Sequence, residues 1–264
     1  MWSQSHNAAY YRTLHADART MRHMSKYITR SGDRARTTTD WLDSAHSFSF
    51  GDHYDPANTH HGVLLVQNED IVVPGQGFDT HPHAETEIVT WVLSGSLVHQ
   101  DSEGHSGVIY PGLAQRMSAG RGIRHSERND DAESPDEPVH FVQMWLMPDE
   151  HGIEPGYEQL DIAGELQPGR LVTVASGSPD HDSAIRIANR SATLSAARLS
   201  ADQRVTVPTA RFTHLFVTRG EVEVDGDRLA ASDAVRAEGF GGSTIRATTD
   251  AEVLIWSMDA RLGE

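Results

Sequence analysis

Short apolar segments separated by turn residues recur along the chain from Ile28 onward. They are rich in β-branched and aromatic residues and are closed by Gly, Pro, Asp or Asn, which is the pattern of β-strands. No amphipathic helix of three or more turns is expected before about residue 150. In the first half we expect strands at residues 63–66, 71–73, 87–93 and 141–147.

A second set of strands follows a connection rich in Pro and Gly at residues 148–169. Asp225-Gly226 is a typical two-residue hairpin turn. Residues 92–98 and 217–224 repeat one arrangement, in which a strand enters a Gly turn and a second strand leaves it. Short strands repeated in this way predict two related β-barrels or sandwiches. The second-half strands are expected at residues 171–175, 185–188, 192–199, 204–207, 214–218, 221–224 and 253–258.

These patterns divide the chain into four parts. Residues 1–27 are polar without a clear period and predict a flexible or weakly helical extension. Residues 28–148 form the first expected domain, 149–170 the linker and 171–264 the second domain. A chain of 264 residues is long enough for two small domains with separate cores.

Composition and charge exclude several functions. The formal net charge is -16, which opposes direct binding to nucleic acid or to an anionic membrane. The chain has no cysteine, so disulfides, thiolate metal sites and a cysteine nucleophile are excluded. Neither a secretory signal nor an apolar run of membrane-spanning length is found. We therefore expect a cytoplasmic protein. It is also expected to be a monomer.

Two short motifs carry candidate metal ligands. In His81-Pro82-His83 the imidazoles are two residues apart, which places both on one face of a strand. Pro82 faces the other way and suits an edge strand. His125 and Glu127 have the same spacing. Neutral imidazoles with a carboxylate suit Fe, Ni, Mn, Co, Cu or Zn.

Chance is the alternative explanation for these motifs, because 16 histidines will produce some pairs at this spacing. Either motif alone does not decide between chance and a metal site. Together, with Gly75 before the first pair and Gly95 closing the following strand, they favour a metal site. The remaining candidates are interpreted as exposed or loop residues, namely His53, His60, His61 and His105.

The first motif also resembles that of a known superfamily. Cupins carry G-x5-H-x-H-x3-E followed by a Gly, and Gly75, His81, His83, Glu87 and Gly95 reproduce it with one extra residue before the last Gly. The runs GFDTHPHAETEIVTWVLSGSLVHQDSEGH and PGLAQRMSAGRGIRHSE resemble the pirin family more specifically. This similarity is strong over residues 28–160 and weaker beyond. It implies an all-β protein of two cupin domains, closest in pattern to bacterial pirin-like quercetin 2,3-dioxygenases.

The resemblance implies one divalent transition metal in the first domain, with iron favoured. Its ligands would be His81, His83, His125 and Glu127. The general cupin rule would instead use Glu87; we favour Glu127, because it shares a strand face with His125. The second domain is expected to hold no metal, since the matching strand has only one histidine, His214, followed by Leu-Phe.

The activity implied is cleavage of a flavonol such as quercetin with O2, releasing carbon monoxide. Glu127 would act as general base toward the flavonol 3-hydroxyl. One alternative is a non-catalytic metal-binding regulatory protein that acts through protein partners. Another is a catalytic site whose natural substrate is a different phenol or enediol.

Overall fold

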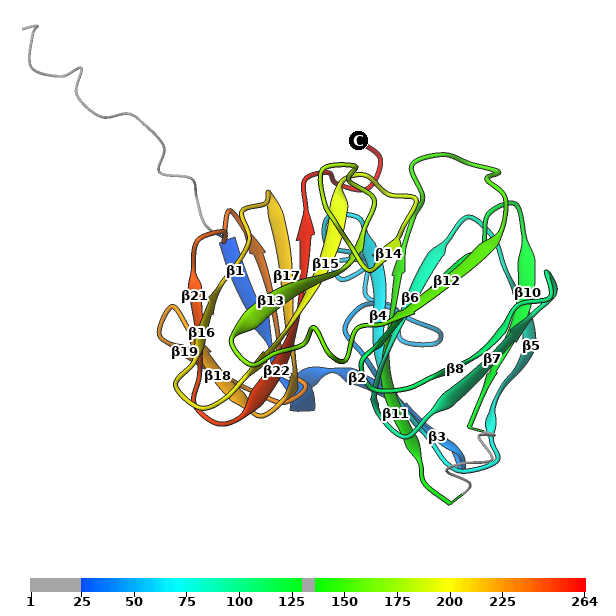
Figure 1. The fold of residues 1–264 in the computed structure, drawn as a ribbon, viewed down its shortest axis with the longest axis horizontal. Helices are drawn as coiled ribbons and strands as arrows, with labels where there is room; N and C mark the ends of the chain where they lie inside the picture. Colours follow the sequence, from blue (N-terminus) through cyan, green and yellow to red (C-terminus); the bar gives the residue numbers. More distant parts are fainter. Residues whose placement is uncertain (1–24, 130–135) are drawn as a thin grey trace, which may run out of the picture.

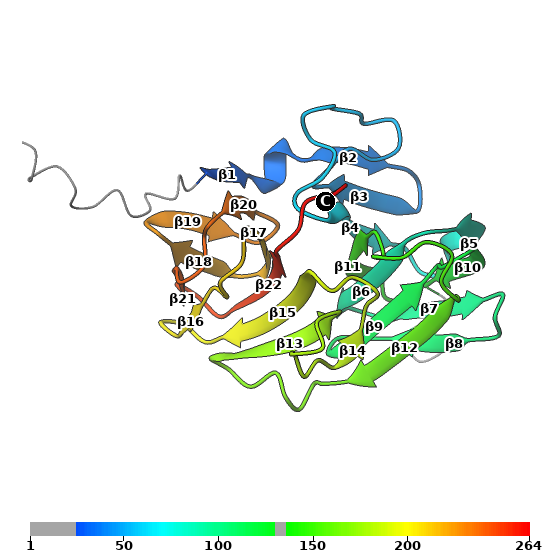
Figure 2. The same ribbon diagram turned by 90° about the horizontal axis from the view of Figure 1, so that it is seen from above.

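The computed structural model of the protein describes residues 25–129 and 136–264. The described residues form two β-rich halves that lie side by side (Figures 1 and 2). Within them no helix is long and apolar enough to cross a membrane. The extension expected over residues 1–27 lies outside the described residues, apart from its last three.

The first half consists of a larger and a smaller antiparallel sheet. In its described part the larger sheet has the strand order β12 (Gly156–Asp161), β9 (Leu113–Ser118), β6 (Glu87–Ser94), β11 (Val139–Leu146), β4 (Leu64–Val72), β3 (Leu42–His46) and β2 (Ala35–Thr38). The smaller sheet has the order β5 (Gly77–His83), β10 (Ile123–Arg128), β7 (Leu97–Asp101) and β8 (Ser106–Ile109).

The second half repeats this arrangement. Its larger sheet has the order β1 (Ser25–Thr29), β20 (Ala234–Glu238), β17 (Phe212–Arg219), β22 (Ala251–Met258), β15 (Ala192–Leu199), β13 (Arg170–Ser176) and β14 (Ile185–Arg186). Its smaller sheet has the order β16 (Arg204–Thr206), β21 (Thr244–Ala247), β18 (Glu221–Val224) and β19 (Asp227–Ala230). A short 3-10 helix, Ser31–Asp33, follows β1.

The expectation of an all-β protein with two similar halves is confirmed, and most expected strands appear close to their expected bounds. The hairpin turn at Asp225-Gly226 is also present, with positive φ at both residues. One difference lies in β4, where the two runs expected at 63–66 and 71–73 belong to a single strand. The polar residues between them are buried and bonded: Asn68 to His46, and Glu69 to Arg34.

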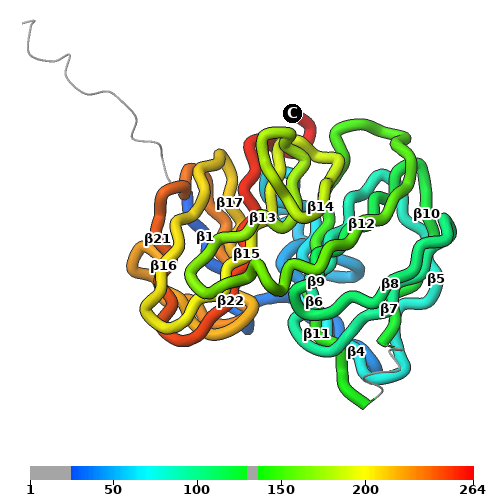
Figure 3. Tube along the Cα trace, in the orientation of Figure 1, coloured from blue at the N-terminus to red at the C-terminus, as the bar shows by residue number. Residues whose placement is uncertain are grey.

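Both ends of the first half depart from the expected division of the chain. Within the segment expected as a linker, β12 pairs with β9 and extends the larger sheet of the first half. Residues 162–169 then connect β12 to β13, as the tube in Figure 3 shows. At the other end β1 pairs with β20, from Ser25 opposite Glu238 to Thr29 opposite Ala234. The first described strand therefore belongs to the sheet of the second half.

The apolar core has one part between the halves, one inside the second barrel and two inside the first barrel. The faces of the two larger sheets pack together through residues such as Trp91, Val142 and Trp256. Trp91 donates a hydrogen bond across this boundary to Glu252 at 3.0 Å, and Trp256 contacts the sulfur of Met144 at 3.1 Å. Burial of this apolar surface holds the halves together. The first barrel also contains buried polar side chains, such as His99, His125 and Glu127.

Candidate metal centre

Strands β5 and β10 bring the two sequence motifs together. His81 lies directly opposite His125 in the antiparallel register, while Glu127 lies opposite Phe78. Two residues of β5 therefore oppose Ser126 alone, which is a β-bulge of the kind often found beside functional sites. Pro82 lies on β5, an edge strand of the smaller sheet, in the position that its missing N–H allows.

Three imidazoles form a compact cluster. The ring centroids are 4.9 Å apart for His81 and His83, 4.5 Å for His81 and His125, and 5.0 Å for His83 and His125. One nitrogen of each ring lies within 4.8 Å of the others. Such an arrangement of convergent nitrogens suits one divalent transition metal ion.

The hydrogen bonds of these rings fit metal ligation. The Nδ1–H of His81 donates to the carbonyl oxygen of Asp79 at 2.8 Å, which leaves Nε2 with its lone pair. The Nε2 atoms of His83 and His125 are buried and have no partner among the described residues. Burial, with the neighbouring imidazoles, lowers the pKa of His83 to about 4 and that of His125 to about 3. Both rings are therefore neutral at pH 7, the form that binds metals.

Glu127 lies beside this cluster, and its carboxylate is oriented by a side chain of the larger sheet. Its side chain is 2 % exposed. The amide of Gln143 donates to Oε1 at 3.0 Å and to Oε2 at 2.8 Å. The Nε1–H of Trp145 donates in turn to Oε1 of Gln143 at 2.9 Å, and its ring packs edge-on against His83. A carboxylate oxygen of Glu127 comes within 4.8 Å of ring nitrogens of His125 and His99.

His99 was not a candidate from the sequence, yet it contacts His125 directly. Their Nδ1 atoms are 3.5 Å apart, and Nε2 of His99 lies 3.2 Å from Oδ2 of Asp101. His125 supplies the N–H between the rings when its Nε2 keeps the lone pair, and His99 then donates to Asp101. Nδ1 of His105 lies 3.0 Å from the same carboxylate oxygen, and Tyr157 stacks on His99. Asp101 and His99 thus orient His125 as carboxylates orient metal-binding histidines.

Glu87, the alternative carboxylate, points out of the first barrel. It shares a face of β6 with Val89 and Trp91, which lie in the core between the halves. Its Oε2 accepts the backbone N–H of Ala188 at 2.9 Å. Ile88, on the opposite face, packs instead near Ile123 of β10.

The other histidines named from the sequence lie away from the imidazole cluster or at its margin. His214 is fully buried between the halves, where it packs 5.6 Å from the ring of Phe48. His105 is half-buried beside Asp101. The remaining three, all outside the named strands, line a cavity at the boundary of the halves: His53, His60 and His61.

Two similar β-barrels, one with convergent histidines inside, define a two-domain cupin. The chain belongs to the pirin family. Residues 29–146 match the family model described as Pirin, and residues 173–258 match that of the quercetinase C-terminal cupin domain. The expected resemblance to this family is thereby confirmed.

Several relatives cover most of the chain. A Mycobacterium tuberculosis protein provisionally named quercetin 2,3-dioxygenase is 57% identical over 90% of this chain and 96% of its own length. The Escherichia coli quercetin 2,3-dioxygenase is 37% identical over 88% of this chain and 98% of its own. Among solved structures, the bacterial pirin YhhW of Escherichia coli in complex with nickel(II) has a TM-score of 0.81 at 34% identity, covering 89% of this chain and all of that one.

Proposed function

We propose that this protein is a metal-dependent dioxygenase that cleaves flavonols such as quercetin with O2 and releases carbon monoxide. The observation that carries this proposal is the cluster of three convergent imidazoles beside a buried carboxylate. The names of the relatives support the same reaction class, and the nickel complex of YhhW supports a metal in a related fold.

The proposed ligands of one divalent transition metal are His81, His83, His125 and Glu127. The orphaned Nε2 atoms of His83 and His125 support this choice. Iron is the favoured metal, and Ni, Mn, Co, Cu and Zn are possible with the same ligand types. When bound, the metal would supply Lewis acidity that makes the flavonol 3-hydroxyl easier to deprotonate.

The protein would contribute binding and proton transfer. Glu127, held by Gln143 in the buried barrel, would accept the proton of the 3-hydroxyl. His81 also lines a hollow of about 360 Å³ with Trp41, Phe78 and Arg128. Trp41 and Phe78 meet edge to face there, with centroids 5.3 Å apart, and offer apolar surface to a phenolic ring.

A turnover assay on reconstituted protein tests the proposal. The protein is loaded separately with each of the six metals, and at least one loaded form should consume the long-wavelength absorbance of quercetin, take up O2 and release carbon monoxide. Metal-free protein and His125→Ala correct for slow oxidation by free metal, and His181→Ala, in the second half, serves as a matched control. Rates no higher than those of metal-free protein for every metal and flavonol would contradict the proposal and favour a non-catalytic metal-binding regulator.

A further inference from the structure

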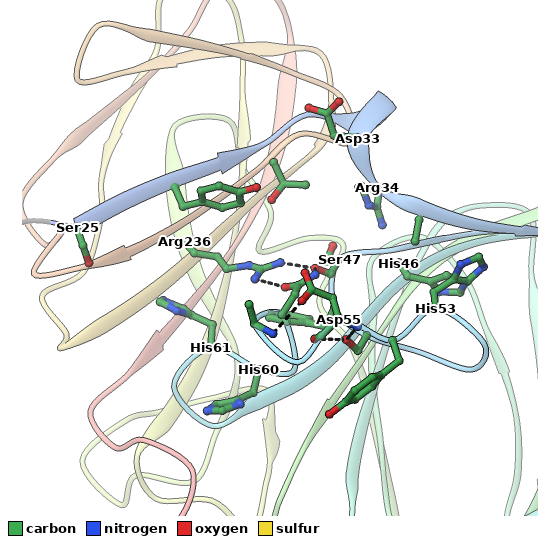
Figure 4. Close-up of a pocket in the computed structure, with 18 of the residues that line it drawn as sticks. Ser25, Asp33, Arg34, His46, Ser47, His53, Asp55, His60, His61 and Arg236 are labelled. Carbon is green, nitrogen blue, oxygen red and sulfur yellow. Dashed lines mark hydrogen bonds between the residues drawn. The ribbon is translucent and has the colours of Figure 1, made fainter.

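A cavity of about 770 Å³ lies at the boundary of the two halves, within the size range of small-molecule sites. One wall comes from β1 and β20 of the second half. The other comes from the end of β3 and the loop at residues 47–61 (Figure 4). The histidines of the imidazole cluster do not line it.

Arg236 supplies a cation to this cavity. Its guanidinium donates to Asn58 Oδ1 and to the backbone oxygen of Ser47, and it lies 4.2 Å from the ring centroid of Phe48 (Figure 4). These are neutral partners, and no carboxylate of the described residues forms an ion pair with Arg236. Arg34, the other arginine in the lining, is neutralised by Glu69 at 2.5 Å.

The charge of Arg236 is partly removed from water. Burial lowers its pKa to about 10, so the guanidinium is still a cation at pH 7. A cation in such surroundings is unfavourable until an anion pairs with it. The guanidinium has five N–H groups, and two serve the bonds to Asn58 and Ser47.

Other polar atoms around the cavity also have no partner. Thr29 Oγ1 and Arg236 Nε belong to residues of the lining, are buried, and have no hydrogen-bond partner among the described residues. Folded proteins rarely leave such atoms without a hydrogen bond to protein, water or ligand. Their grouping around one cavity indicates that a polar ligand belongs there.

Aromatic and imidazole side chains form another part of the cavity lining. Phe48, His46 and His61 form part of the wall, and burial lowers the pKa of both histidines, so they are neutral rings at pH 7. Tyr27 and Tyr54 lie at the margin, 65% and 74% exposed. These surfaces favour an aromatic ligand.

Acidic residues in the lining limit the ligand to a single negative charge. Asp33 and Asp55 are exposed, and Glu238 is already paired with Arg261 at 3.2 Å. Like charges near the margin oppose a second anionic group on the ligand. We propose that this cavity is a binding site for a small aromatic monocarboxylate, whose carboxylate pairs with Arg236 and whose ring lies among Phe48 and the neighbouring imidazoles.

Titration calorimetry with benzoate tests this site in the metal-loaded protein, with benzamide as the neutral isostere. Benzoate should bind one site with a Kd of about 1 mM or below. Benzamide should bind at least about tenfold more weakly, because it lacks the charge that Arg236 recognises.

Variants locate the binding. Arg236→Gln should weaken benzoate binding about tenfold or more, whereas Arg204→Gln, which removes an exposed arginine of β16, should leave it unchanged. If Arg236→Gln fails to fold, Arg236→Lys and Asn58→Ala should each weaken it instead. His125→Ala should have no effect, since the site is separate from the imidazole cluster. No benzoate binding, equal affinity for benzamide, or loss of binding in His125→Ala would overturn the proposal.

Discussion

The side-chain amide of Gln143 reaches both carboxylate oxygens of Glu127, at 3.0 and 2.8 Å. Gln143 belongs to β11 of the larger sheet and Glu127 to β10 of the smaller one, so this pair joins the two walls of the first barrel. Because the same amide serves both oxygens, it sets the direction of the carboxylate beside the imidazoles.

Gln143→Ala should therefore weaken metal binding without abolishing it. Loss of an outer hydrogen-bond partner typically lowers metal affinity about 10- to 100-fold. Competition with a chromophoric chelator measures the change, and Gln100→Ala, an exposed position of β7, is the matched control. Unchanged affinity in Gln143→Ala would show that the carboxylate does not depend on this amide.

Replacement of the two candidate carboxylates separates their roles. Glu127→Gln should lose most of the metal and of the turnover, because it removes the proposed ligand and base. Glu87→Gln should retain both, since Glu87 points toward Ala188 at the boundary of the halves. Elemental analysis and flavonol turnover of both variants check this, and the reverse outcome would support the general cupin assignment.

The imidazole cluster should bind about one divalent metal per chain, consistent with three convergent histidines in one barrel. His81→Ala or His83→Ala should largely abolish metal binding, while the circular dichroism spectrum stays that of the parent protein because the apolar cores are separate from the cluster. Two metals per chain by elemental analysis, or collapse of the spectrum in these variants, would contradict this prediction.

His99 should affect metal affinity through His125. His99→Ala removes the partner of His125 Nδ1, and Asp101→Asn removes the carboxylate that faces His99. Each should weaken metal binding about tenfold or more, measured by the same chelator competition. The double variant should lose less than the sum of the two single effects, because both act on one ring. Additive losses would mean that the two residues act independently.

The free energy of unfolding should decrease as the pH rises, because of the buried carboxyl group of Asp70. Burial raises the pKa of this carboxyl from 3.8 to about 7, so between these values the folded state holds a proton that the unfolded state has lost. Stability should therefore decrease from about pH 4 to pH 7 by at most about 4 kcal/mol. Asp70→Asn should flatten this slope and raise the melting temperature more at pH 8 than at pH 5. An equal slope in the variant would assign the pH dependence to other groups.

The sequence was sufficient to predict the fold and the meeting of the two motifs. Spacing of two residues places His81 and His83 on one strand face, and the hairpin turn at Asp225-Gly226 has a local signature. The direction of the Glu87 side chain could not be predicted in this way. Apolar residues follow it on both faces of β6, so polar and apolar positions do not alternate along the strand.

The residues that orient His125 and Glu127 were harder to predict from the sequence. His99 and Asp101 look like ordinary alternating positions of an exposed strand, and their contact with His125 depends on the pairing of β7 with β10. Gln143 did offer a signal, since it is the single polar residue within the run FVQMWLM. The strand break expected in β4 was wrong, because buried polar residues there are bonded across the boundary and within the barrel.

The pairing of β1 with β20 bears on how the chain acquires its structure during synthesis. β1 is synthesised long before β20. The first described strand therefore stays without its pairing strand until β20 is made near the end of translation. The first barrel can form in the meantime, but the second sheet gains its edge strand only when nearly the whole polypeptide has emerged. If the two barrels were expressed as separate fragments, β1 would accordingly remain on the fragment of the first barrel, and the larger sheet of the second barrel would lack this edge strand.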